Sequence, residues 1–162
     1  MDDTHISLAH GNGGRRMRDL IEAVFARHLG NPDLDTGADA ISLVIPAGIT
    51  GTQGQGRQNN EIVVTTDGFT VQPLVFPGGD IGSLAIHGTA NDLAVVGAKP
   101  LYFTLNAFLE EGLAIDLLDR IAASMVLRPS KFEGHCPMIR HGCRMALMVA
   151  LNWSVECVKE ES

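Results

Sequence analysis

This 162-residue sequence has little cysteine and few aromatic side chains. No cysteine precedes Cys136, and the total of three is an odd number, so the sequence predicts no disulfide framework and fits a reducing compartment. Aromatic residues make up only 5% of the chain. We therefore expect a single domain, with an appendage, whose core is filled mainly by aliphatic side chains.

Positive charge and long apolar runs are also scarce. Lys and Arg number 12 against 19 Asp and Glu, which gives a net charge of -7 and argues against nucleic acid or an anionic membrane as a partner. No apolar run approaches the roughly 20 residues of a membrane span. The first residues also lack the positive charge of a signal peptide. These absences predict a cytoplasmic protein.

Three stretches with apolar residues at helical spacing predict helices over 15–29, from Ile81 to near Gly97, and over 114–125. The first ends at Gly30-Asn31-Pro32, a typical helix stop. The apolar face expected for the second comprises Ile81, Leu84, Ala85, Gly88, Asp92 and Val95. The residues expected to point inward from the third are Ile115, Leu118, Ile121, Ala122 and Met125.

Strands are predicted between these helices. Residues 61–67 and 101–108 are rich in β-branched or apolar residues, and a second short strand is expected within 69–76. Residues 46–60 are rich in Gly, Gln, Thr and Asn, which predicts a mobile loop. The alternation favours an α/β or α+β domain, with a mixed sheet covered by helices.

The glycine-rich run His10-Gly11-Asn12-Gly13-Gly14 comes directly before the first helix. Glycines let backbone amides turn toward one point, and a helix start adds partial positive charge, so the run suits an anion. It is neither a P-loop nor a dinucleotide fingerprint, because no Gly-Lys-Ser/Thr follows and Arg16 replaces the third glycine. Phosphate binding is one interpretation, and an ordinary turn is the other.

Two aspartates are candidate metal ligands. Asp67 ends a predicted strand, where it either faces a crevice or simply forms a turn with Gly68. Asp92 follows Asn91 on the expected apolar helix face, where a carboxylate must be compensated. Either Mg²⁺ bridging to phosphates or hydrogen bonds from the amides of a neighbouring loop would compensate it.

The character of the chain changes after Met125. Residues 1–125 hold 7 Lys and Arg against 15 Asp and Glu, whereas residues 126–162 hold 5 against 4. His135-Cys136 and His141-Gly142-Cys143 raise the weaker hypothesis of a metal cluster, although their spacing does not match zinc patterns. We therefore divide the chain into a domain at 1–125 and an atypical tail at 126–162, a pattern that suggests a frameshift or truncation.

The motifs of residues 5–125, in this order, resemble the HypE family of hydrogenase maturation factors, within the AIR synthetase and selenophosphate synthetase superfamily. The segments that carry the resemblance are Leu8–Gly14, Thr65–Phe69, Phe76–Gly82, Gly88–Val95 and Phe108–Leu113. Of these, Phe-Pro-Gly-Gly and Leu-Glu-Glu-Gly-Leu point to HypE itself. The absence of cysteine before Cys136 separates the chain from selenophosphate synthetases, which carry a reactive Cys or selenocysteine near the N-terminus.

The resemblance implies an AIR synthetase-like N-terminal domain that forms a homodimer, with strands of twin subunits closing a barrel and ATP near the interface. It implies that Asp67 and Asp92 hold Mg²⁺. The residues implied in ATP binding are His10, Gly11, Gly13, Gly14, Asp67, Gly78, Gly79, Asn91 and Asp92.

The activity implied by the resemblance is ATP-dependent dehydration of a cysteine-bound carbamoyl group to a thiocyanate, the source of the cyanide ligands of NiFe hydrogenase. A HypF-type carbamoyltransferase would supply the carbamoyl group, and a HypC and HypD complex would receive the product. The family's C-terminal domain and terminal cysteine have no counterpart here, because Cys157 lies in a different context, so the catalytic residue is unknown. The alternative is an inactive fragment that retains nucleotide binding or dimerisation.

Overall fold

The computed structural model describes residues 3–32, 34–38, 40, 42–43, 63–98 and 100–126. The predicted loop at 46–60, the tail domain and the possible metal cluster of the tail lie outside these residues. In chain order, the elements are the 3-10 helix η1 (Leu8–Gly11), α1 (Arg15–Leu20), the π-helix η2 (Ile21–Ala26), α2 (Arg27–Leu29), β1 (Val75–Phe76), β2 (Gly79–Asp80), α3 (Ile81–Val95) and α4 (Ile115–Ser124).

The first helical run confirms the helix predicted over 15–29, since α1, η2 and α2 follow one another without interruption. The run ends where the Gly30 amide donates to the Ala26 carbonyl oxygen at 2.9 Å. The π-helical turn was not predicted, because a single wide turn leaves no periodicity signal. The buried side chains of the run are Leu20, Ile21, Val24, Phe25 and Leu29.

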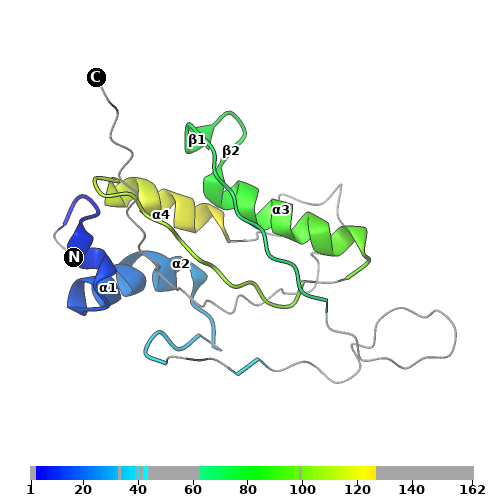
Figure 1. Ribbon diagram of the computed structural model, residues 1–162, viewed down its shortest axis with the longest axis horizontal. Helices are drawn as coiled ribbons and strands as arrows, with labels where there is room; N and C mark the ends of the chain where they lie inside the picture. The colour runs from blue at the N-terminus through cyan, green and yellow to red at the C-terminus, as the bar shows by residue number, and fades with distance from the viewer. Residues whose placement is uncertain are drawn as a thin grey trace, which may run out of the picture.

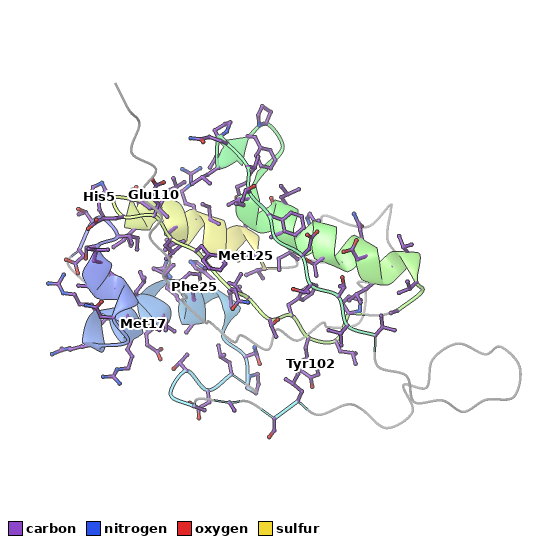
Figure 2. All side chains as sticks on the ribbon, in the orientation of Figure 1. His5, Met17, Phe25, Tyr102, Glu110 and Met125 are labelled. Carbon is purple, nitrogen blue, oxygen red and sulfur yellow. The ribbon has the colours of Figure 1, made fainter. Side chains whose placement is uncertain are left out.

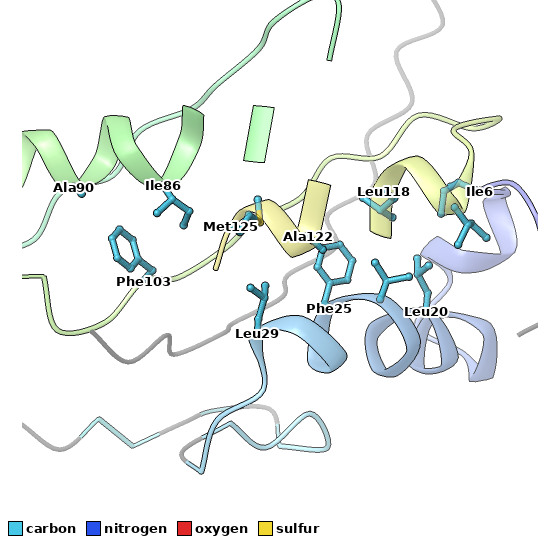
Figure 3. Packing of buried hydrophobic residues seen from close by; sticks show 12 residues of the cluster. Ile6, Leu20, Phe25, Leu29, Ile86, Ala90, Phe103, Leu118, Ala122 and Met125 are labelled. Carbon is cyan, nitrogen blue, oxygen red and sulfur yellow. The ribbon is translucent and has the colours of Figure 1, made fainter. Parts of the chain in front are cut away.

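Helix α4 packs beside this run, with the blue helices lying beneath the yellow one in Figure 1. All five residues predicted to point inward from it, Ile115, Leu118, Ile121, Ala122 and Met125, are buried. Phe25 faces Ala122 in the centre of the core, where an aromatic ring fits because the opposing side chain is small (Figure 3). The third predicted helix and its inward face are therefore confirmed.

The N-terminal segment is tied to the start of α4, a contact the sequence did not indicate. The Ile6 amide donates to the Leu113 carbonyl and the Gly112 amide to the Ile6 carbonyl, each at 2.8 Å. The Ile115 amide donates to the Thr4 carbonyl at 2.9 Å. Figure 2 accordingly shows His5 and Glu110 at the same end of the molecule.

The predicted inward face of the second helix is wrong. The buried residues of α3 are Gly82, Ile86, Ala90 and Leu93, whereas Leu84, Asp92 and Val95 are exposed. Apolar residues surround this helix on every side, so periodicity alone could not identify the face that packs. The helix is instead oriented by its neighbours, because Gly82 lies against α4 and Phe103 packs beneath Ile86 and Ala90 (Figure 3).

The mixed α/β class is confirmed, but most of the predicted strands are wrong. Within the described residues the sheet is the antiparallel hairpin β1–β2, with Val75 opposite Asp80 and Phe76 opposite Gly79. Residues 63–67 and 101–108 form no strand. The second stretch keeps the alternation of a strand, with Phe103 and Leu105 inward and Thr104 and Asn106 outward. A strand also needs a neighbouring strand to which its backbone hydrogen-bonds, and the alternation of apolar residues does not show whether one is present.

Candidate nucleotide-binding site

The extended segment before the hairpin runs alongside α3, in the opposite direction (Figure 1). The Thr65 hydroxyl donates to Asp92 Oδ2 at 3.3 Å, near the C-terminal end of the helix. The Phe69 ring lies against Gly88, one helical turn earlier. At the other end of the helix, the Ile81 amide donates to the Leu74 carbonyl at 2.9 Å. Asp67, between Thr65 and Phe69, is thereby brought to the same half of α3 as Asp92.

Asp67 is exposed and accepts the hydrogen of the Gly68 amide on Oδ1 at 2.7 Å. This bond is local, but Asp67 and Gly68 form no turn, so the turn expected as an alternative is not confirmed. The contact occupies one oxygen, and the carboxylate keeps further acceptor sites. The local hydrogen bond and a ligand-binding role are therefore compatible at Asp67.

Asn91 and Asp92 are also exposed, which corrects the expectation that Asp92 sits on a buried helix face. Its hydrogen-bond donor is a hydroxyl group, so the alternative of a carboxylate held by loop amides is also wrong. A solvated carboxylate carries little desolvation penalty and needs no compensating ion for stability. Asp67 and Asp92 nevertheless offer oxygen donors, which suit a hard cation such as Mg²⁺.

The described residues hold no group of three or more His, Cys, Asp or Glu side chains that could bind a metal ion. A cation held by Asp67 and Asp92 would therefore need ligands from elsewhere. Mg²⁺ is commonly held by one or two carboxylates plus phosphate oxygens and water. The donor set thus fits an exchangeable cation, whose remaining ligands are water or phosphate oxygens, better than a resident structural metal.

The hairpin glycines Gly78 and Gly79 lie at the opposite end of α3. Gly78 has a φ of +96°, which favours glycine, and the hairpin delivers Asp80 to the start of the helix. Asp80 accepts the Ser83 amide at 2.9 Å and also accepts the Ser124 hydroxyl, so it both caps α3 and joins it to α4. At about 1.5 Å per residue, this 15-residue helix separates the hairpin from Asp92 by roughly 20 Å.

The glycine-rich loop lies near the N-terminus, at the far side of the molecule from the Asp92 end of α3 (Figure 1). The imidazole of His10 is only 1% exposed, and its Nδ1 accepts the Ser7 amide at 3.0 Å. Its Nε2 lies 3.5 Å from Asp3 Oδ2, and the same carboxylate accepts from Arg16 at 3.0 Å. The imidazole is thus enclosed within the loop, whereas Asn12, Gly13 and Arg15 are exposed and Gly11 and Gly14 are partly exposed.

The predicted site residues therefore fall into three groups within one chain. One group lies at the C-terminal half of α3 and comprises Asn91 and Asp92 on the helix and Asp67 beside it. The second is the pair Gly78 and Gly79 in the hairpin, and the third is the distant glycine-rich run at residues 10–14. Residues 63–98 contain three aspartates and no Lys or Arg. Every Lys or Arg among the described residues lies on α1, α2 or α4, as Arg15, Arg16, Arg18, Arg27 and Arg120. Within the described residues, neither the Asp67 segment nor α3 carries a Lys or Arg.

Comparison with known families defines the class of this domain. Residues 39–133 match the family described as AIR synthase related protein, N-terminal domain. The chain belongs to this family. The match runs past Met125, so the placement of the boundary at residue 125 stays a prediction.

Within the family, the chain is similar to the hydrogenase maturation protein HypE. It is 45% identical over 120 residues to carbamoyl dehydratase HypE of Rhizobium leguminosarum bv. viciae, covering 74% of this chain and 31% of the relative. It is 44% identical over 142 residues to carbamoyl dehydratase HypE of Azotobacter vinelandii, covering 85% and 38%. The chain thus spans about a third of the length of these relatives.

A solved structure supports the same relationship. The crystal structure of hydrogenase maturation protein HypE in complex with ATP superposes with a TM-score of 0.62 at 43% sequence identity. The superposition covers 73% of this chain and 31% of that one. None of the helices in the described part of this chain is long and apolar enough to cross a membrane.

Proposed function

We propose that this chain is the nucleotide-binding N-terminal domain of a HypE-type carbamoyl dehydratase, acting in the cytoplasm. The observation that carries the proposal is the alignment of the Asp67 segment with α3, which gathers Asp67, Asn91 and Asp92 at one end of the helix. Support comes from the 43% identity to a HypE that was crystallised with ATP.

Asp67 and Asp92 would hold Mg²⁺ together with phosphate oxygens of ATP. The ion supplies positive charge that offsets the charge of the phosphates and polarises the bond to the transferred group. Asn91 adds an amide that can donate to a phosphate oxygen or accept from the ribose. The backbone amides of residues 11–14 and of the Gly78–Gly79 hairpin are further donors to phosphate.

A homodimer would unite the groups that are far apart in one chain. Residues 101–109 have the alternation of a strand, and no strand is assigned to them within the described residues. This alternating stretch and the exposed Phe108 provide a surface onto which the same segment of a second copy can pair. The glycine loop of one copy and the carboxylates of the other would then contribute to one site.

The reaction proposed for the complete protein dehydrates a carbamoyl group on a cysteine thiolate. ATP transfers its γ-phosphoryl group to the carbamoyl oxygen, and loss of that oxygen as phosphate, with the two amide protons, leaves a thiocyanate. A HypF-type carbamoyltransferase and a HypC and HypD complex would be the partners before and after this step. The described residues contain no cysteine, so their contribution is the handling of ATP.

Isothermal titration of the purified chain with ATP, with and without Mg²⁺, tests the proposal. We expect Asp67→Asn and Asp92→Asn to weaken Mg–ATP binding about tenfold or more, because each removes a charged ligand. Asp116→Asn removes an exposed carboxylate from α4 and should leave the affinity unchanged. Binding without hydrolysis would support the alternative of a nucleotide-binding fragment, and no binding at all would contradict both.

A further inference from the structure

Three contacts hold residues 65–74 on α3 in one consistent alignment. Thr65 contacts Asp92, Phe69 contacts Gly88, and Leu74 bonds to Ile81. The segment thus runs antiparallel to the helix. The alignment places Asp67 between the first two contacts, beside the half of α3 that carries Asn91 and Asp92.

The Phe69 ring makes a close packing contact with α3 near the carboxylates. The Thr65–Asp92 bond is at the long end of the hydrogen-bond range and involves exposed groups. Within the described residues, the backbone bond from Ile81 to Leu74 is the one main-chain hydrogen bond between the segment and α3, and it lies at the far end. A slip of one residue would turn the Asp67 side chain toward the opposite side of the extended segment.

The Phe69 ring occupies the space that a side chain at position 88 would need. A Cβ atom built on Gly88 would lie 2.6 Å from Phe69 Cε1, and Cζ would be nearer still. On the α4 side of the same helix, a Cβ on Gly82 would lie 2.5 Å from the Ile121 carbonyl oxygen and 2.8 Å from Ser124 Oγ. Two glycines of α3 thus admit close neighbours, the Phe69 side chain at Gly88 and the backbone of α4 at Gly82.

We propose that Phe69 and Gly88 are positioning residues that set the register of the Asp67 segment on α3, so that Asp67 and Asp92 bind one divalent cation together. Neither residue touches the cation. The ring inserted at Gly88 stops the segment from sliding, and the carboxylate two residues earlier is thereby held beside Asp92. Because the cation is the one expected with ATP, this role rests on the proposed function.

Matched variants of the full chain distinguish positioning from general stability. Gly88→Ala displaces the Phe69 ring, whereas Gly82→Ala forces apart two helices through backbone atoms. We expect Gly82→Ala to lower the melting temperature more than Gly88→Ala does. Phe69→Leu lacks the ring atoms that would meet the new methyl group, so the Gly88→Ala/Phe69→Leu double variant should recover the alignment.

The affinity for Mn²⁺ can be measured by loss of the free-ion signal in electron paramagnetic resonance. The two glycine substitutions should affect this affinity in the opposite order to their effects on the melting temperature. We expect Gly88→Ala to weaken Mn²⁺ binding about tenfold, since a small displacement of one ligand breaks a shared site. Gly82→Ala should leave the affinity of the folded protein unchanged. The double variant should regain most of the lost affinity.

Equal effects of the two glycine substitutions on Mn²⁺ affinity, or no recovery in the double variant, would overturn the positioning role. Failure of the parent chain to bind Mn²⁺, or binding that persists in Asp92→Asn, would overturn the shared site. If Mn²⁺ binds as expected and Mg–ATP does not, the proposed nucleotide function fails, while the positioning role of Phe69 and Gly88 stands.

Discussion

His28 Nε2 lies 2.9 Å from Asp119 Oδ1, and this contact ties α2 to α4 across 91 residues of sequence. Arg27 bonds to the same carboxylate oxygen. Asp119 is only 27% exposed, so its pairs are better shielded from solvent than those of an open surface ion pair. One carboxylate therefore serves as the polar link between the N-terminal helical run and the helix that completes the core.

Replacing Asp119 with Asn should destabilise the fold by about 1 kcal/mol, because a charge-assisted contact is lost at a partly buried position. Chemical denaturation would measure the change, and added salt should shrink it. Asp19→Asn is the matched control, since Asp19 pairs only with the largely exposed Arg15 at 3.7 Å. A control that lost as much stability would contradict the special role of Asp119.

The sequence was sufficient for the helices whose apolar residues fall on one side. Residues 15–29 and 115–124 combine a clear apolar face with a polar one, and the buried residues follow that pattern. It was not sufficient for α3, because Leu84 and Val95 are as apolar as Ile86 and Leu93. Which face is buried depends on Gly82 meeting α4, a contact between distant segments.

Alanine substitutions on the two faces of α3 test this correction. Ile86→Ala should cost about 2–5 kcal/mol, since Ile86 is 6% exposed and packs in the core. Leu84→Ala should cost less than about 1 kcal/mol, because Leu84 is already 36% exposed. Urea unfolding followed by circular dichroism would compare them. If Leu84→Ala proved the more damaging variant, the face first expected from periodicity would be restored.

The residue types of the candidate site were predictable from the sequence, whereas its geometry was not. The motifs drew attention to Asp67 and Asp92, but the burial expected for Asp92 was wrong, and nothing in the local pattern indicated that Thr65 would reach it. The only sign in the sequence of the contact between Phe69 and Gly88 is that Gly88 is an isolated glycine within a predicted helix. Contacts of this kind depend on the path of the chain between elements, which periodicity does not contain.

Removing the hydroxyl of Thr65 should weaken Mg–ATP binding about twofold, because one long and exposed hydrogen bond to Asp92 is lost. Thr65→Val keeps the branched shape and removes the donor. Thr65→Ser keeps the donor and serves as the control, with an affinity close to that of the parent chain. Calorimetric titration distinguishes the two, and equal affinities for the Val and Ser variants would show that the bond does not contribute.

A charge placed at Phe108 should prevent self-association. Phe108 is 70% exposed on the alternating stretch at 101–109, so Phe108→Asp would put a charge into the proposed dimer contact. Val95→Asp places the same charge on an exposed valine at the end of α3. Sedimentation velocity should show a dimer for the parent chain and the Val95 variant, and a monomer for the Phe108 variant. A dimer that persists in Phe108→Asp would locate the contact elsewhere.

The confinement of Lys and Arg to α1, α2 and α4 gives the described part of the chain an electric asymmetry, with residues 63–98 at its negative pole. A bare nucleotide approaching Asp67 and Asp92 is repelled until a divalent cation screens its phosphates. Raising the ionic strength should therefore speed the association of metal-free ATP with this surface, the reverse of what a basic phosphate-binding loop does. The cation is then part of the recognition itself, since it lowers the negative charge of the nucleotide and can bridge its phosphates to the carboxylates.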